Sequence, residues 1–276
     1  MEQILIRKAN IKDIKGIQNI HRNCDDPWHD ENECIAWVEK RLERGFYIQV
    51  AECCHNIVGH GEWIISNEPN QNYLYLGMLQ IDSEFQKRGI GRAMIDNGIE
   101  YAKNNNCSSI ITIPDTDTGS EMFYTKCGFT QCRNIKKCVI PTMYYDNFHS
   151  NKKQIDSIPF HVIKELPFVF GLSQTSSRHM WEVCNEKPDT DDRLTPAIFL
   201  NDGSYIQLSY FKGNDTALAL CWSKLQDKDY VIKHIISFGY ECNLKAIEFV
   251  FYEEHTHLFE KMKIEHENME YIRLLH

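Results

Sequence analysis

The spacing of apolar residues changes repeatedly along this chain, and each change predicts a switch between strand and helix. Short runs rich in branched and aromatic residues are typical of strands. Apolar residues three and four positions apart are typical of a helix that buries one face. In the first half these patterns predict, in order, a strand, two helices, a hairpin, a strand, a helix and a strand, at residues 4–9, 11–20, 34–44, 46–65, 73–81, 90–102 and 109–113. A further helix and strand follow from residue 120 onward.

The second half of the chain repeats this order more weakly. Its patterns predict strands and one helix at residues 197–211, 216–222, 228–243 (the helix) and 246–251. The polar stretch at residues 146–159 is the natural linker between the halves. We therefore expect an α/β fold with a mixed sheet (α+β), built from two domains at residues 1–147 and 155–276.

Glycines stand where a predicted strand turns into a predicted helix. The strand ends at Ile81, and Gln86-Lys87-Arg88-Gly89-Ile90-Gly91 opens the helix. The first N–H groups of a helix have no partners inside it and lie at the positive end of its dipole, which favours phosphate. Glycine also lets the backbone approach an anion closely. No G-x-x-x-x-G-K-[ST] string occurs, and Met94 stands at the third glycine of G-x-G-x-x-G, so neither of these two phosphate loops is present.

A second motif follows later in the chain, at Ser120-Glu121-Met122-Phe123-Tyr124-Thr125-Lys126-Cys127-Gly128-Phe129. Together the two motifs resemble the GNAT N-acetyltransferase superfamily. Its pyrophosphate loop reads Q/R-x-x-G-x-G/A, and its later helix and strand often read A-x-x-x-Y-x-K-x-G-F. The matching residues are Gln86, Gly89 and Gly91 in the first motif and Tyr124, Lys126, Gly128 and Phe129 in the second, with Ser120 in place of the common alanine. The resemblance covers roughly residues 3–146 and implies a GNAT-like fold with acetyl-CoA as the acetyl donor.

The resemblance implies a set of contacts to acetyl-CoA. Backbone N–H groups of residues 87–92 would bind the pyrophosphate. The side chains of Lys87 and Arg88 would either contact it or be solvated surface charges. The preceding strand would offer the N–H groups of Leu79 and Ile81 to the pantetheine arm and the thioester carbonyl. Asp117 stands where many members carry asparagine, so it can accept from a pantetheine amide but donates only when protonated. The predicted cofactor-binding residues are therefore Leu79, Ile81, Gln86, Lys87, Arg88, Gly89, Ile90, Gly91, Arg92, Asp117 and Tyr124.

Two residues are candidates for proton transfer. By the resemblance, Tyr124 would protonate the departing thiolate, although an unperturbed phenol has a pKa of about 10 and a thiol one of about 8.5. The alternative for Tyr124 is an aromatic ring packed under its helix. Glu62 is the candidate base for the amine, with His60 on the same face of its strand; the alternatives are solvated strand residues or a water relay. Tyr75 occupies the position, eleven residues before the loop glutamine, where some GNAT enzymes carry glutamate.

The second domain lacks the residues that these roles require. When the two halves are aligned, Phe259 stands at the position of Tyr124, and Lys263 stands at that of Gly128. The segment 223–228 that precedes its helix contains no glycine. We therefore predict a degenerate, non-catalytic GNAT-like domain that does not bind CoA in the usual way.

The bulk composition narrows the partners and the compartment. The net charge is −9 at pH 7, and acidic residues outnumber basic ones in both halves, so nucleic acid is not an expected partner and a cationic small molecule is compatible. Eleven cysteines are an odd number without framework spacing, the first residues lack a signal peptide's apolar core, and no apolar stretch could cross a membrane. We expect a cytoplasmic protein with reduced thiols. Cys53-Cys54-His55 and His255-x-His257 do not have zinc-site spacing, so no metal is expected.

These observations predict an enzyme that moves an acetyl group from acetyl-CoA directly to a primary amine, on a small molecule or on a protein terminus or lysine. The segment Asp25-Asp26-Pro27-Trp28, with Trp37, is a candidate acceptor wall because indole faces and carboxylates attract ammonium groups; the alternative is a surface loop. Two other functions stay open. One is a sensor or scaffold that binds acetyl-CoA without turnover, and the other is a C-terminal half that selects the substrate.

Overall fold

The helices and strands of the first half follow the order that the apolar pattern predicts. The computed structural model describes residues 4–23, 31–69, 71–115, 119–145, 152–171, 176–184, 192–211 and 213–275. The elements of the first half, with short 3₁₀ turns labelled η, are β1 (Ile4–Lys8), η1 (Ile11–Asp13), α1 (Ile14–Asn23), α2 (Glu31–Glu43), β2 (Tyr47–Cys53), β3 (Asn56–Glu68), β4 (Gln71–Ile81), η2 (Ser83–Phe85), α3 (Ile90–Asn104), β5 (Ser109–Thr112), α4 (Ser120–Lys126) and β6 (Thr130–Pro141). Every helix and strand predicted for this half is present, so these predictions are confirmed.

The second half contains the predicted strands and helix, together with elements that the pattern did not indicate. Its elements are β7 (Lys152–Ile155), α5 (Val162–Glu165), β8 (Phe168–Phe170), α6 (Ser177–Cys184), β9 (Asp192–Leu194), β10 (Ala197–Leu200), β11 (Tyr205–Phe211), β12 (Thr216–Trp222), α7 (Lys228–Glu241), β13 (Ala246–Tyr252), η3 (Glu253–Leu258) and β14 (Glu265–Leu274). The elements that the sequence analysis missed are β7, α5, β8, α6, β9, η3 and β14. Most of these elements are too short to show a regular spacing of apolar residues in the sequence.

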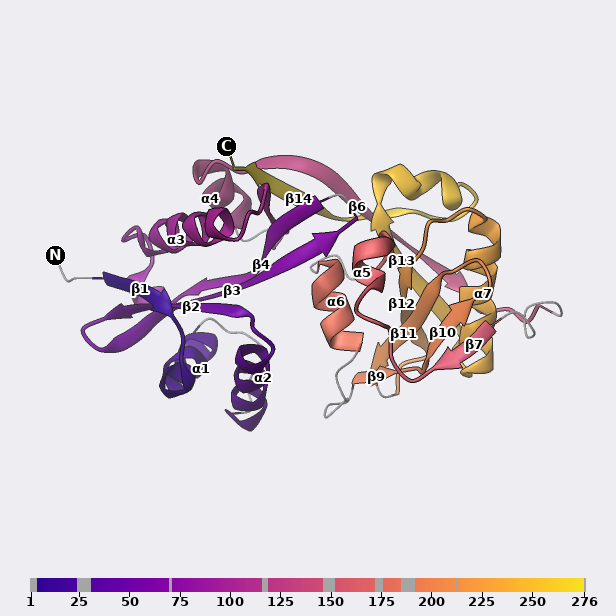
Figure 1. Ribbon diagram of the computed structural model, residues 1–276, viewed down its shortest axis with the longest axis horizontal. Coiled ribbons are helices and arrows are strands. Elements are labelled where there is room, and N and C mark those ends of the chain that lie inside the picture. The colour runs from indigo at the N-terminus through magenta and orange to yellow at the C-terminus, as the bar shows by residue number, and fades with distance from the viewer. Residues whose placement is uncertain are drawn as a thin grey trace.

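One mixed sheet runs through both halves (Figure 1). Among the described residues its strands follow the order β1-β2-β3-β4-β5-β14-β6-β13-β12-β11-β10-β7, with β8 also beside β12 and β9 beside β11. The pairs β4–β5 and β12–β13 are parallel. The pairs in the middle of the sheet, where the two halves meet, are antiparallel. The predicted mixed α/β sheet is confirmed.

The two halves exchange their last strands. Along the chain β6 follows the β4–β5 pair and β14 follows the β12–β13 pair, yet β5 is paired with β14 and β13 with β6. β6 and β14 also pair with each other in the middle of the sheet, and Figure 1 shows both strands crossing between the halves. The division of the chain at residues 147 and 155 stays a prediction. In the sheet, the last strand of each segment pairs with strands of the other segment.

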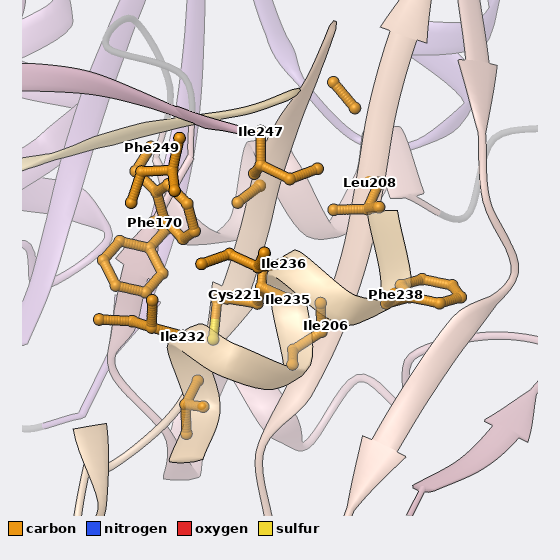
Figure 2. Close-up of a cluster of buried hydrophobic side chains, with 14 of the residues drawn as sticks. Phe170, Ile206, Leu208, Cys221, Ile232, Ile235, Ile236, Phe238, Ile247 and Phe249 are labelled. Carbon is orange, nitrogen blue, oxygen red and sulfur yellow. The ribbon is translucent and has the colours of Figure 1, made fainter. Parts of the chain in front are cut away.

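Apolar layers hold helices against both faces of the sheet. In the first half, α1 and α2 cover one face, and α3 and α4 cover the other (Figure 1). In the second half, α7 packs on the central strands. Figure 2 shows Ile232, Ile235 and Ile236 of α7 in one buried cluster with Ile247 and Phe249 of β13. Both long helices after a parallel strand, α3 and α7, are therefore anchored by their buried faces.

Helix α6 of the second half packs on the first half, beside α2. The Ser177 N–H donates to Glu68 Oε1 at the end of β3, at 3.2 Å. The Arg44 guanidinium donates to the Glu182 carbonyl at 3.0 Å. Within the second half, the Trp222 indole N–H donates to Ser177 Oγ at 2.8 Å. Residues of the second half therefore shape the α1/α2 face of the first.

Candidate active site

A run of backbone amides without hydrogen-bond partners marks the start of α3. Among the described residues, none of the N–H groups of residues 86–92 donates to another group, whereas the Ala93 N–H donates to the Gly89 carbonyl at 3.0 Å. Lys87 and Gly89 have left-handed backbones, with φ of 59° and 84°. Such turns gather successive N–H groups into a concave surface that suits an anion. The loop thus has the backbone geometry that suits a phosphate at the positive end of a helix.

Three polar side chains of this loop donate to nearby backbone carbonyls and hold the shape of the loop. Gln86 Nε2 donates to the Ile81 carbonyl at 3.1 Å, which ties the loop back to the end of β4. The Arg88 guanidinium donates to a carbonyl of η2 at 2.8 Å. The Arg92 guanidinium donates to the Lys126 carbonyl and so links α3 to α4. Two of the predicted cations therefore lie at the rim and hold the shape of the loop.

The strands β4 and β5 separate next to this loop. Their last pair joins Leu76 to Thr112, and β4 then continues to Ile81 beside β3. The register between β3 and β4 shifts at Gly77, which is an extra residue in β4. A bulge bends the strand that carries it, so it helps β4 to diverge from β5. A gap between the two strands therefore opens toward the start of α3.

The backbone of the diverging part of β4 is directed into this gap. The Asp82 N–H donates to the Val58 carbonyl of β3 at 3.0 Å. Along an antiparallel strand, successive N–H groups point to alternate sides. The N–H groups of Leu79 and Ile81 therefore point away from β3, to the side that β5 has left. This is the orientation that the predicted contacts to a pantetheine arm require.

Tyr124 of α4 places its hydroxyl at the same gap. Its ring is only 7% exposed and packs edge-on against Phe123 and Phe129, at centroid distances of 5.2 and 5.5 Å. The hydroxyl is hydrogen-bonded to the Thr112 side chain, and Thr112 Oγ1 donates to the Leu76 carbonyl at 3.1 Å. Burial raises the pKa of Tyr124 well above the usual phenol value. The ring is therefore a packing residue, and the hydroxyl keeps its proton at neutral pH where β4 and β5 part.

Glu62 lies on the opposite face of the sheet, in a buried group with two histidines. Its Oε1 is 3.6 Å from His60 Nε2, and His60 Nδ1 is 3.2 Å from His21 Nε2. Burial, with His21 as a second cause, lowers the pKa of His60 to about 3, so this imidazole is neutral. Burial raises the pKa of Glu62 to about 8, against an opposing effect of Arg41. A carboxyl with this pKa can act as a general base where it is deprotonated, at about pH 8 and above.

We expect the stability of the protein to depend on pH through Glu62. Its carboxyl has an ordinary pKa of 4.5 but keeps its proton up to about pH 8 in the fold. Between these values the folded state binds more protons, so the free energy of unfolding falls as the pH rises, by on the order of a few kcal/mol. Glu62→Gln should remove this fall, as measured by urea unfolding of both proteins at about pH 5 and about pH 8. An equal fall in the variant would assign the effect to another group.

The structure also brings together a polar cluster that the sequence analysis missed. Arg133 Nε and Nη2 donate to the two oxygens of Glu270 at 2.8 and 3.0 Å, and the Tyr252 hydroxyl donates to Glu270 Oε2 at 2.6 Å. Glu270 is 2% exposed. These residues come from β6, β14 and β13, which only the strand exchange makes neighbours. No spacing in the sequence signals the cluster.

Some predicted features lie outside the described residues. They are Asp117, the acidic segment at residues 25–28 and the side chain of Trp37. In the part of the chain that the structure describes, no helix is long and apolar enough to span a membrane. Within the same residues, no group of three His, Cys, Asp or Glu side chains is placed to hold a metal ion.

Comparison with known sequences identifies one family. Residues 14–129 match the profile of the acetyltransferase (GNAT) family. An uncharacterized N-acetyltransferase of Methanocaldococcus jannaschii is 31% identical over 107 residues, which make up 37% of this chain and 46% of that protein. The chain thus matches less than half the length of this relative.

Solved structures are similar over the whole chain. A GCN5-related N-acetyltransferase from Anabaena variabilis has a TM-score of 0.64 at 14% identity, covering 99% of this chain and 73% of that one. A tandem GNAT protein from the clavulanic acid biosynthesis pathway has a TM-score of 0.58 at 12% identity and covers 99% of both chains. At these identities the likeness concerns the fold. It confirms the predicted architecture of two GNAT-like units.

Proposed function

Because residues 14–129 of this chain form a domain of the acetyltransferase (GNAT) family, we propose that the protein is a cytoplasmic enzyme that transfers an acetyl group from acetyl-CoA to the primary amine of a small molecule. The observation that carries this proposal is the run of unpartnered amides at residues 86–92, next to the gap between β4 and β5. In this proposal the start of the helix accommodates the pyrophosphate of CoA, and the gap between the parallel strands accommodates the pantetheine arm with its thioester. The site lies within the predicted domain at residues 1–147.

The backbone supplies the contacts to the donor in this proposal. The amides of residues 86–92 bind the pyrophosphate, and Gln86 keeps the loop at the end of β4. The N–H groups of Leu79 and Ile81 line the gap and donate to the pantetheine arm and to the thioester carbonyl, where negative charge develops during acyl transfer. Acetyl-CoA itself supplies an activated acetyl group as a thioester.

Side chains on the two faces of the sheet move the protons. Glu62 accepts one proton from the ammonium group of the acceptor, directly or through water. The free amine then attacks the carbonyl carbon, and the C–S bond breaks as the C–N bond forms. Tyr124 gives its proton to the thiolate and regains one from the new amide nitrogen through solvent. One amine and one thioester thus yield one amide, one thiol and one released proton.

The second half, predicted at residues 155–276, is proposed to be non-catalytic. At the start of α7 the Tyr230 N–H donates to Asp227 Oδ1 at 3.0 Å, and just before it the Leu225 N–H donates to Ser223 Oγ at 2.8 Å. A carboxylate of the chain itself thus occupies the helix start where a phosphate would bind. Phe259, at the position of Tyr124, is buried and has no hydroxyl to give a proton.

The proposed function is tested by binding and then by turnover. Calorimetry with acetyl-CoA should show one site per chain. Release of the CoA thiol is then followed with a panel of n-butylamine, 1,4-diaminobutane, 2-aminoethanol and free lysine. Binding without thiol release from any amine would favour a sensor or scaffold, and two sites would contradict the non-catalytic second half. If no acetyl-CoA bound, the proposal would be wrong at its foundation.

A further inference from the structure

Helix α4, which carries Tyr124, is too short to fix its own position. It has only 7 residues, Ser120–Lys126, and an isolated helix shorter than about 12 residues is marginal in water. Tyr124 lies in the last turn of this helix. The place of its hydroxyl therefore depends on how the end of α4 is held by the rest of the protein.

Two arginine side chains hold the last carbonyls of α4. Carbonyls at the end of a helix have no partners inside it, and this end of the helix dipole favours cations. The Arg92 guanidinium of α3 donates to the Lys126 carbonyl. The Arg273 guanidinium of β14 donates to the Cys127 carbonyl. One of these two contacts therefore comes from the last strand of the second half.

The Arg273 guanidinium lies beside the turn that ends α4. Gly128 has a left-handed backbone there, with φ of 84°, as is common after the end of a helix. A Cβ atom at Gly128 would be 3.5 Å from Arg273 Cζ, so the guanidinium is next to the turn itself. The Phe129 N–H, one residue further on, donates to the Tyr124 carbonyl at 3.1 Å. The turn that Arg273 contacts is thus closed onto the backbone of Tyr124.

Strand β14 also belongs to the surroundings of the Tyr124 side chain. Residues two apart on a strand share a face, so Tyr271 lies on the same face as Arg273. Tyr271 is buried in one apolar cluster with Tyr124. In the sheet it pairs with Thr112, whose side chain is hydrogen-bonded to the Tyr124 hydroxyl. The ring, the hydroxyl and the helix end of the proposed acid therefore all lie next to this one strand.

The position of a general acid limits the rate of its proton transfer. The acid must come within hydrogen-bond distance, about 2.6–3.2 Å, of the atom that it protonates. A misplacement of about 1 Å can cost roughly 100-fold in rate. A loosened end of α4 would let the Tyr124 hydroxyl move away from the sulfur of acetyl-CoA. The amides of residues 86–92 belong to the start of α3, so binding of the pyrophosphate would hardly be affected.

We propose that Arg273 is a positioning residue for acetyl transfer, which holds the end of α4 so that the Tyr124 hydroxyl stays at the departing sulfur. The second half, without an active site of its own, thereby sets the rate of the reaction in the first half. This inference rests on the proposed function. In it Arg273 touches neither substrate and acts only through Tyr124.

The test compares Arg273→Gln with the wild type in the full chain, using acetyl-CoA and the amine of the panel with the fastest turnover. Gln removes the charge and shortens the side chain. We expect kcat to fall roughly 10-fold, whereas KM for the amine and Kd for acetyl-CoA should hardly change. Arg273→Lys should regain most of the rate, because the bond to the Cys127 carbonyl uses one nitrogen and does not need the guanidinium fork.

A double-mutant comparison separates positioning from a general loss of stability. In Tyr124→Phe there is no acid to position, so adding Arg273→Gln should lower kcat no further. A purely structural role predicts the same fold-loss in both backgrounds. Arg44→Gln is the matched control, because it removes another guanidinium–carbonyl bond between the halves, to Glu182 of α6. It should leave kcat unchanged.

An unchanged kcat in Arg273→Gln would overturn the proposal, and so would an equal fall in the Tyr124→Phe background. If Arg273→Gln does not fold, Arg273→Met, which keeps an unbranched apolar stem, is measured with the same expectations. Wild-type turnover by Tyr124→Phe would overturn the proposal too, because no acid would then need a position. Wild-type protein that releases no thiol with any amine would instead refute the proposed function itself.

Discussion

Replacement of Gly91 by glutamate is expected to abolish measurable binding of acetyl-CoA. A Cβ atom at Gly91 would lie 3.1 Å from Phe123 Cζ, so the new side chain has to extend into the concave loop at the start of α3. Its carboxylate would face the pyrophosphate, and like charges brought together at an interface cost several kcal/mol. The Kd should therefore rise roughly 1,000-fold, as measured by calorimetry.

Two control variants separate charge from shape in this experiment. Gly91→Ala adds only the crowded Cβ atom, which the edge of the Phe123 ring can relieve by moving a few tenths of an ångström. It should weaken binding only a few-fold. Asn104→Glu adds the same charge at the exposed far end of α3 and should leave the Kd unchanged. Full acetyl-CoA affinity in Gly91→Glu would show that the pyrophosphate does not bind at this loop.

Replacement of Tyr124 by phenylalanine should lower kcat roughly 100-fold at saturating substrates, because loss of a positioned acid removes at least that much from general acid catalysis. The affinity for acetyl-CoA should hardly change, since the ring stays packed between Phe123 and Phe129. Thr112 Oγ1 can keep its bond to the Leu76 carbonyl, so the loss of stability should be about 1 kcal/mol. Steady-state rates and urea unfolding of both proteins measure these quantities.

A matched tyrosine provides the control. Tyr101 lies on α3, stacked on Tyr47 at a centroid distance of 4.0 Å, and Tyr101→Phe should leave kcat unaltered. If Tyr124→Phe also turned over at the wild-type rate, the hydroxyl would have only a packing role. The thiolate would then take its proton from water.

The sequence analysis was most successful where structure is decided locally. The segment from Tyr73 to Asn104 shows a long apolar strand, a glycine-containing turn and a long amphipathic helix, each with its own period. The unpartnered amides of residues 86–92 follow from the same local facts, because a helix start always leaves N–H groups without intrahelical partners. Tyr124 was found through its motif, and it lies in the helix that the motif predicts, whereas its role stays a prediction.

The candidate base was harder to evaluate from sequence. Glu62 and His60 alternate with glycine and tryptophan along their strand, as solvated residues would. Nothing local in the sequence distinguishes a buried carboxyl from a solvated one at this position. In the structure His21 of α1 and the covering helices bury them. The raised pKa of Glu62 is caused by this burial, which belongs to the packing of distant elements and not to the strand itself.

The sequence by itself determined the order of strands and helices, the glycine-containing turn with its exposed amides at the start of α3 and the absence of an equivalent glycine loop in the second half, since each depends on residues that are close along the chain. Only the tertiary structure decided which strands become neighbours. Pairing of β5 with β14 and of β13 with β6 joins residues more than a hundred positions apart. Any strand in which apolar and polar residues alternate suitably could pair with the same edge of the sheet. The cluster of Glu270, Arg133 and Tyr252 exists for that reason alone.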